Sequence, residues 1–301
     1  MDYKKLIKTP EMRQNILRTL NFIPDDIMLK IQYYIKLGRR LKLRKPERFT
    51  EKLQWYKMYY RDPQMSQCVD KYQVREYVKS CNLEDSLVKC YGVFNSVEEV
   101  DFETLPNRFV LKKTNGGGGL NVLLCRDKET FDIEAAKATM LQWIQDSREE
   151  PGGREWAYKG IPTRIVAEEY LENEENPEAG ISDYKFFCFD GEPVGLVVDV
   201  DRYTGHKRNF YDINWNYQDI SSDCPNFGDH LPKPDGYEDM VEATRMLSKG
   251  FPFVRVDLYL IKGRVYFGEL TFYPWSGYVQ FSPDSFDYDM GKHFVLPEKK
   301  I

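Results

Sequence analysis

The sequence lacks the patterns that mark several common protein classes. No apolar run approaches the roughly 18 residues of a membrane-spanning helix, and the first ten residues contain no apolar core of a secretory signal. The 3 histidines lie far apart and the 6 cysteines form no CxxC pair, so the common zinc motifs are excluded. We therefore expect a cytoplasmic protein with reduced, mostly buried thiols.

A basic excess is also missing. The 301 residues contain 43 Lys and Arg against 48 Asp and Glu, a net charge of -5 that argues against nucleic acid as a partner. The length suits one large or two modest domains, and 42% hydrophobic residues suffice for a core. Aromatic residues are frequent, at 15%. The one local basic cluster runs from Lys36 to Arg48.

The chain changes from helical to strand-like patterns along its length. The first sixty-odd residues are predicted helical, with Ile27, Ile31, Tyr34 and Ile35 on one face of a helix. Later segments alternate as strands do, and Asp190-Gly191 is typical of a two-residue hairpin turn. These patterns predict an α+β fold with an antiparallel sheet. Strands are predicted over 108–112, 120–125, 164–171, 184–189, 195–200, 253–260 and 264–270, and helices over 133–144 and 236–249.

Four consecutive glycines separate two of the predicted strands. Gly116, Gly117, Gly118 and Gly119 would let backbone N–H groups approach phosphate oxygens without obstruction. A P-loop needs a helix after the loop, so this arrangement favours a hairpin lid over a nucleotide. Lys112, just before the loop, is placed to neutralise a phosphate. The alternatives are a flexible hairpin tip and an ordinary edge-strand charge. The catalytic motifs of protein kinases are missing.

Two carboxylates near the C-terminus form the most specific candidate site in the sequence. A turn at Lys262-Gly263 predicts that the flanking strands pair, which places Asp257 opposite residue 268 or 269. Arg255, Asp257 and Glu269 then share one face. Mg²⁺ is usually held by one or two carboxylates together with phosphate oxygens. An arginine can stabilise the negative charge on a phosphoryl group during its transfer. An internal salt bridge of Arg255 remains the alternative.

Taken in order, these motifs resemble the ATP-grasp ligases. The whole chain is most similar to their TupA-like branch, bacterial proteins linked to the synthesis of teichuronopeptide and capsule-type polysaccharides. The similarity covers nearly the full length. The matching segments are Phe49-Thr-Glu-Lys-Leu-Gln-Trp55, Asp70-Lys-Tyr-Gln-Val-Arg-Glu76, Phe109-Val-Leu-Lys112, Arg154-Glu-Trp156, Asp183-Tyr-Lys-Phe-Phe-Cys-Phe189, His206-Lys-Arg-Asn-Phe-Tyr-Asp212 and Phe251-Pro-Phe-Val-Arg-Val-Asp257.

The resemblance implies an ATP-grasp fold, in which two α+β lobes clamp ATP. It assigns Lys112 to the α- and β-phosphates and residues 116–119 to a mobile lid. The residues implied for adenine are Glu168, Glu169 and Leu171, and Asp183 falls near the usual ribose-binding acid. The implied segments are a basic helical extension over 1–65, a connecting segment over 66–107, a small lobe with the lid over 108–171 and a large lobe over 172–301.

The resemblance also implies a magnesium and phosphate site. Asp257 and Glu269 match the Mg²⁺ ligands, and Arg255 matches a phosphate-binding arginine. The family usually has Asn as a second-metal ligand where this chain has Thr271, a weaker neutral ligand, so one or two ions are possible. Three further basic residues are expected to face phosphate, a substrate carboxylate or solvent: Lys185, Lys207 and Arg208.

The activity implied is ATP-dependent ligation of a carboxylate with a small amine through an acyl phosphate. The acid is expected to be a uronic acid of a surface polysaccharide or of its precursor. A glycosyltransferase and a sugar kinase on the same scaffold are the alternatives, and Asp199-Val-Asp201 is a DxD string. The cluster from Lys36 to Arg48 would bind a lipid-linked glycan or the inner membrane surface, or be a solvated helix end. Four aromatic residues after Glu269 are candidates for stacking on a sugar: Phe272, Tyr273, Trp275 and Tyr278.

Overall fold

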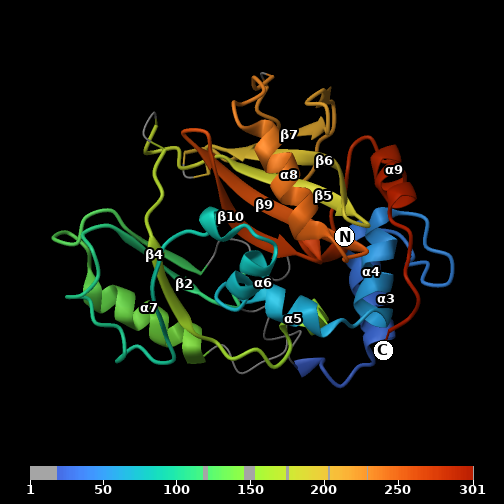
Figure 1. Ribbon diagram of the computed structural model, residues 1–301. Helices are drawn as coiled ribbons and strands as arrows, with labels where there is room; N and C mark the ends of the chain where they lie inside the picture. The colour runs from blue at the N-terminus through green and yellow to red at the C-terminus, as the bar shows by residue number, and fades with distance from the viewer. Residues whose placement is uncertain are drawn as a thin grey trace.

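A computed structural model describes residues 19–117, 121–145, 153–173, 176–202, 204–228 and 230–300. Two antiparallel sheets with packed helices form the molecule (Figure 1). This confirms the predicted α+β class and the antiparallel pairing. Gly118 and Gly119 of the predicted lid lie outside the described residues. Within those residues, no helix is long and apolar enough to cross a membrane.

The smaller sheet has four strands in the order β1-β4-β2-β3. Phe109 and Leu111 of its central strand are fully buried and pack with Met140 and Trp143 of helix α7. Burial of such side chains contributes about 1.5–3 kcal/mol each. The elements of this part are β1 (Cys90–Phe94), β2 (Phe109–Lys113), β3 (Val122–Cys125), α7 (Ile133–Gln145) and β4 (Ile165–Glu169).

The larger sheet has six strands in the order β10-β9-β5-β6-β7-β8, with α8 lying along it (Figure 1). Both predicted hairpin turns occur: Asp190 and Gly191 have φ of 50° and 83°, and Lys262 and Gly263 have 51° and 74°. The elements are β5 (Asp183–Phe189), β6 (Glu192–Val200), β7 (Lys207–Asp212), β8 (Tyr217–Gln218), α8 (Tyr237–Ser248), β9 (Phe253–Ile261) and β10 (Arg264–Thr271).

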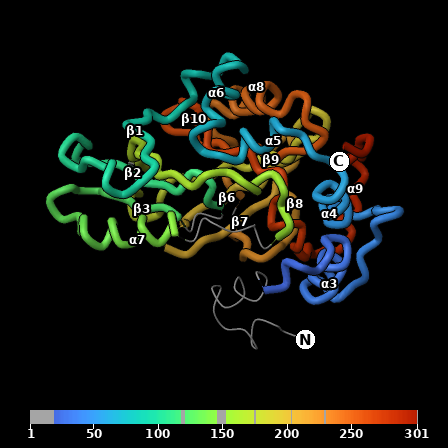
Figure 2. The backbone as a smooth tube through the Cα atoms, turned by 90° about the horizontal axis from the view of Figure 1, so that it is seen from below, coloured from blue at the N-terminus to red at the C-terminus, as the bar shows by residue number. Residues whose placement is uncertain are grey.

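The N-terminal helices pack against the end of the larger sheet, opposite α7 (Figure 2). Phe49, which begins α4, is fully buried and contacts the rings of Phe187, Phe253 and Phe294 at centroid distances of 6.2, 5.1 and 6.5 Å. This part of the chain therefore shares a core with the sheet. The remaining elements are α3 (Asp25–Leu37), α4 (Phe49–Tyr59), α5 (Pro63–Val69), α6 (Val74–Ser80), η1 (Glu84–Ser86), η3 (Trp156–Tyr158), η4 (Pro274–Gly277) and α9 (Ser285–His293).

The apolar face predicted for the first of these helices points to solvent. Ile27, Ile31, Tyr34 and Ile35 are 45%, 42%, 61% and 48% exposed. The helix instead buries the face that carries Met28, Leu29, Gln32, Tyr33 and Leu37. No described part of the chain covers this apolar face.

Candidate active site

The β9–β10 hairpin brings two carboxylates together. Glu269 lies opposite Asp257 in the register, and an irregularity between Phe267 and Glu269 inserts Gly268 as a bulge. A Cβ atom on Gly268 would lie 2.8 Å from the backbone oxygen of Asp257, so only glycine lets the strands approach this closely. The register expected from the sequence is therefore present, and the bulge aligns the two acids.

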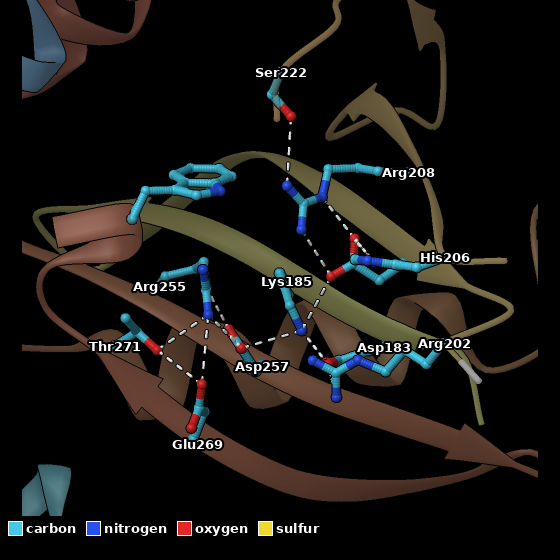
Figure 3. A network of polar contacts seen from close by, with 12 residues as sticks. Asp183, Lys185, Arg202, His206, Arg208, Ser222, Arg255, Asp257, Glu269 and Thr271 are labelled. Atoms are coloured by element: carbon cyan, nitrogen blue, oxygen red, sulfur yellow. Dashed lines mark hydrogen bonds and ion pairs between the residues drawn. The ribbon is translucent and has the colours of Figure 1, made fainter. Parts of the chain in front are cut away.

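Arg255 joins these carboxylates on the same face of the sheet. Its guanidinium donates to both carboxylate oxygens of Asp257, each at 2.7 Å, and to the hydroxyl of Thr271 at 3.2 Å (Figure 3). Its Nη2 also lies 3.5 Å from Glu269. The internal salt bridge considered from the sequence therefore exists in this structure. The Thr271 hydroxyl donates in turn to Glu269 at 3.2 Å, which extends the network.

Burial and neighbouring cations act on the two acids in different proportions. Burial raises the pKa of Asp257 to about 6, against the opposite effect of Arg255 and Lys185. Burial also acts upward on Glu269, but Lys71 and Arg255 outweigh it and lower the pKa of that carboxyl to about 2. At neutral pH both groups are mainly ionised, so each offers oxygen ligands to a cation.

Lys185 of β5 lies at the centre of the polar network. Its side chain is only 6% exposed and forms an ion pair with Asp183, and its ammonium lies 3.6 Å from Asp199 and 3.3 Å from Asp257 (Figure 3). Lys185 is therefore a buried cation among three acids and not a solvated strand charge. Asp183 is itself buried and lies 3.3 Å from Arg202, a residue the sequence did not single out.

Arg208 and Lys207 point to different surroundings although they are neighbours on β7. Arg208 is 7% exposed at its side chain and contacts Asp199 at 2.6 Å and Asp223 at 2.8 Å. Lys207 instead lies over the ring of Phe227 at 5.4 Å. Within the described residues, Lys207 makes no contact with the acidic network, because adjacent residues on a strand point to opposite faces. The structure thus brings Arg208, but not Lys207, to the site.

A cavity of 330 Å³ lies beside this network, where the two sheets face each other. Lys112, Glu169 and Leu171, three of the residues expected to bind ATP, line it together with Arg202 and His206. Its walls are largely apolar, which suits a planar base with polar groups at the rim. The apolar lining includes Val88, Val110, Val122, Leu124, Ile181 and Tyr259.

Glu168 points away from this cavity. Its carboxylate is bound by Lys112 at 2.7 Å and by Arg75 at 3.5 Å, and the residue is 6% exposed. Of the two adjacent acids expected at the hinge strand, only Glu169 lines the apolar cavity. Glu168 instead holds Lys112 toward a small polar space that Lys71 and Gly268 also line.

Lys71 is a site residue that the sequence analysis missed. Its ammonium donates to the backbone oxygen of Gly116 at 2.6 Å and lies 3.4 Å from Glu269, so it links the glycine loop with the paired carboxylates. Asp70 fixes this segment by accepting from the backbone of Tyr72 and Gln73 at 3.0 and 2.8 Å. The motif from Asp70 to Glu76 was the available signal, but only tertiary contact reveals the role of Lys71.

The donor set fits a magnesium–nucleotide complex and not an ion held by protein alone. Within the described residues, no group of three or more His, Cys, Asp or Glu side chains is placed to hold a metal. Asp257 and Glu269 supply two carboxylates, and Mg²⁺ at such sites takes its other ligands from phosphates and water. The nearby ammonium groups of Lys71, Lys112 and Lys185 match the charge of phosphate oxygens.

Comparisons with known proteins show what this chain resembles. The comparison with curated proteins gave no match. The solved structure of D-alanine–D-alanine ligase from Bacillus anthracis is 16% identical with a TM-score of 0.44, covering 75% of this chain and 67% of that one. L-amino acid ligase from Bacillus licheniformis is 14% identical with a TM-score of 0.44, covering 70% and 44%. ATP-grasp ligase PsnB, complexed with a precursor variant, Mg and ADP, is 14% identical with a TM-score of 0.39, covering 74% and 57%.

This chain therefore spans between 44% and 67% of the length of these three relatives. The model of one protein family, the TupA-like ATP-grasp proteins, matches residues 51–295. That match covers both sheets, the cavity, the paired carboxylates and all of α4 except its first two residues. The chain belongs to the TupA-like ATP-grasp family.

Proposed function

We propose that this protein is an ATP-dependent carboxylate–amine ligase. The observation that carries the proposal is the continuity from an apolar cavity, through lysines suited to phosphates, to the facing acids Asp257 and Glu269. In the proposed reaction a substrate carboxylate oxygen attacks the γ-phosphorus of ATP, and the bond to ADP breaks. An amine then bonds to the carbonyl carbon, loses a proton and displaces phosphate, which leaves an amide.

Each part of the site has a task in this proposal. The adenine occupies the cavity lined by Glu169 and Leu171, while Lys112 and Lys71 bind phosphate oxygens. Asp257 and Glu269, with Thr271 beside them, would hold Mg²⁺, which would offset negative charge on the phosphates of ATP. Arg255 is oriented by its two hydrogen bonds with Asp257 and steadies the transferring group.

The lid and the far end of the network complete the assignment. The loop that begins with Gly116 and Gly117 is proposed to cover the phosphates and to exclude water, which would hydrolyse an acyl phosphate. Lys185 and Arg208 are proposed to orient the substrate carboxylate, since both cations lie in the buried network. Asp183 positions Lys185 and Arg202 instead of meeting the ribose directly.

An acidic sugar is the substrate class we propose, with a small amine as the second reactant. Arg208 provides a cation for a uronic acid, and its guanidinium lies 5.3 Å from the ring of Trp275. Of the four aromatic residues considered for stacking, Phe272 and Tyr273 are buried at 0% and 3% exposure. Trp275 is the one beside Arg208. We propose that the sugar belongs to a glycan unit, or to its precursor, in the synthesis of a capsule-type polysaccharide.

A glycosyltransferase reading has little support from the geometry. The DxD string falls at the end of β6, and the carboxylate of Asp199 is bound by Arg208 at 2.6 and 3.2 Å. Asp199 belongs to the buried network with Lys185 and Arg208 and does not line the apolar cavity. A sugar kinase on the same scaffold differs only in its product, because the phosphoryl group then stays on the sugar.

ADP release with panels of uronic acids and amines tests the proposal. We expect ADP only when a carboxylate is present, an amide as the product, and loss of activity in the double variant Asp257→Asn, Glu269→Gln. Asp239→Asn, an exposed acid on α8, is the matched control. Carboxylate-independent ADP formation, or activity that survives the double variant, contradicts the ligase. Phosphorylated sugar without amine indicates the kinase, and stabilisation by UDP-sugars but not Mg·ATP indicates the glycosyltransferase.

We also propose that the protein works in the cytoplasm at the inner membrane surface. The segment from Asp25 to Arg48 contains 8 basic and 3 acidic residues in a chain with net charge -5. The exposed face of Ile27, Ile31, Tyr34 and Ile35 lies on the helix that directly precedes exposed Arg40, Arg44 and Lys45 in the chain. Apolar side chains beside cations match an anionic bilayer surface or a lipid-linked glycan held in it.

Sedimentation with vesicles tests this location. We expect binding to phosphatidylcholine vesicles only when phosphatidylglycerol is included, and we expect Ile31→Asn with Ile35→Asn to weaken it. Leu141→Asn, at an exposed apolar position on α7, is the control. Binding that ignores anionic lipid, or that survives the paired substitution, contradicts the proposed surface.

A further inference from the structure

The loop that follows the paired carboxylates has an unusual backbone. Trp275 and Ser276 in η4 have φ of 51° and 54°, and Gly277 has 66°, so three consecutive residues are left-handed. Each non-glycine residue in this region costs roughly 1–2 kcal/mol. Such a conformation persists only when the surrounding contacts hold it, and at this loop they come from helix α4.

Lys57 of α4 supplies the strongest of these contacts. Its side chain is fully buried and donates to the backbone oxygen of Ser276 at 2.8 Å, to the Ser276 hydroxyl oxygen at 2.8 Å and to the backbone oxygen of Gly153 at 2.9 Å. Glu155 lies 3.9 Å away. These three hydrogen bonds offset part of the free-energy cost of burying the ammonium group.

Gln54, one helical turn earlier, holds the same loop. Its amide nitrogen donates to the backbone oxygens of Ser276 and Gly277, each at 3.0 Å. A Cβ atom at Gly277 would collide with this amide group, so the position admits only glycine on steric as well as conformational grounds. The side chains of Gln54 and Lys57 together therefore fix residues 275–277. We call this pair of side chains the brace.

The brace determines where the indole of Trp275 lies. One face of the ring stacks on Phe187 at 6.0 Å with an interplanar angle of 19°. The indole N–H donates to Asp223 at 3.0 Å, and the guanidinium of Arg208 lies 5.3 Å from the ring. Phe187 follows Lys185 by two residues and shares its face of β5. Trp275 thus closes the end of the polar network opposite the apolar cavity.

We propose that Lys57 is a positioning residue for the subsite of the sugar acid, acting through the loop that carries Trp275. The inference rests on the proposed ligase function for the identity of the ligand, but the brace itself is independent of it. Lys57 makes no contact with the nucleotide cavity in the described structure. Its loss is therefore expected to affect recognition of the sugar acid while ATP binding is retained.

The test combines two readouts on the full-length protein. In Lys57→Met, we expect acrylamide to quench the fluorescence of Trp275 about twofold more efficiently. The contribution of Trp275 is obtained by difference from a matched protein that also carries Trp275→Phe. The KM for the sugar acid is expected to rise about tenfold, a loss of about 1.4 kcal/mol, with the KM for ATP unchanged. Gln54→Met, which removes the other two hydrogen bonds, carries the same expectations if Lys57→Met does not fold.

Lys52→Met provides the matched control. Lys52 lies on the same helix and donates to the backbone oxygens of Gly291 and Phe294 at 2.8 and 2.7 Å, away from the loop. This variant should lose stability without a change in quenching or KM. Unchanged quenching in the brace variants, or equal changes in both KM values, overturns the inference. Absence of any carboxylate-dependent ADP formation instead contradicts the proposed ligase. In that case the quenching measurement alone tests whether the brace positions Trp275.

Discussion

Glu269 lies directly opposite Asp257 in the β9–β10 hairpin, and the alignment depends on a one-residue bulge at Gly268. Without the bulge, the alternation of side chains along β10 would place one of the two acids on the other face of the sheet. The site therefore depends on a backbone irregularity as much as on the acids themselves.

Gly268→Ala tests the importance of the bulge. The added methyl group would lie 2.8 Å from the Asp257 oxygen, so the strands must separate or the register must shift. We expect the free energy of unfolding to fall by about 1–3 kcal/mol and stabilisation by Mg·ATP to be lost, both measured by urea unfolding. Gly117→Ala, whose added methyl meets nothing within 4 Å, is the control for stability. An unchanged response to Mg·ATP in Gly268→Ala would show that the alignment tolerates movement.

Removal of one of the two carboxylates proposed to bind magnesium should affect magnesium dependence more than stability. In Asp257→Asn we expect the rate of ADP formation to fall by about 100-fold or more, because the charge that holds the ion is halved. The required Mg²⁺ concentration should rise as well. Magnesium titrations at saturating ATP, with thermal unfolding as a check on folding, measure both effects. Near-normal magnesium dependence would exclude Asp257 as a ligand.

Lys71→Gln is expected to weaken ATP binding. The ammonium of Lys71 bridges the Gly116 oxygen and Glu269, where phosphates are proposed to bind. Loss of this cation should raise the dissociation constant of Mg·ATP by about tenfold, or about 1.4 kcal/mol, measured by calorimetry. Lys79→Gln, an exposed lysine on α6 that pairs with Glu76, is the control. Equal affinities for the two variants would rule out a phosphate role for Lys71.

Stability should depend on pH through the buried amine of Lys57. Burial lowers the pKa of Lys57 from 10.5 to about 7; Glu155 has a smaller raising effect on this pKa and Lys36 a smaller lowering effect. The rings of Tyr273 and Tyr278 also face this amine, at 5.9 and 4.8 Å. Between about pH 7 and 10.5 the unfolded chain therefore holds a proton that the folded protein releases, and stability rises with pH.

Urea unfolding of the wild type and Lys57→Met across this range measures the effect. We expect the stability of the wild type relative to the variant to increase with pH by up to about 1.4 kcal/mol per unit. Both forms of the amine satisfy the Ser276 hydroxyl, which accepts from the ammonium and donates to the neutral amine. A stability difference that stays flat with pH would show that Lys57 keeps its proton when buried.

The hairpin was predictable because its rules are local. The turn at Lys262-Gly263 and the two-residue period of strands were enough to place Asp257 opposite residue 268 or 269, and the bulge at Gly268 selects Glu269. β7 was not predicted as a strand, because Arg208 and Asn209 look like exposed residues in sequence. Their burial depends on an ion pair with Asp199 for Arg208 and on tertiary packing for Asn209.

The missed site residues share this non-local origin. Lys71 reaches Glu269 across 198 positions of sequence, and Arg202 meets Asp183 from the loop that follows β6. No periodicity or spacing encodes such approaches. Trp275 could be singled out by its place after the strand that carries Glu269, but its orientation follows from α4, more than 200 residues earlier.

The contacts of α4 with residues 275–277 also have an evolutionary consequence. A change in the loop that alters which acid is accepted would leave Lys57 or Gln54 without partners, and a buried amine without acceptors destabilises the fold. The helix and the loop are thus expected to vary together among homologues. For the same reason, grafting the loop of one homologue onto another should succeed only when α4 is transferred with it.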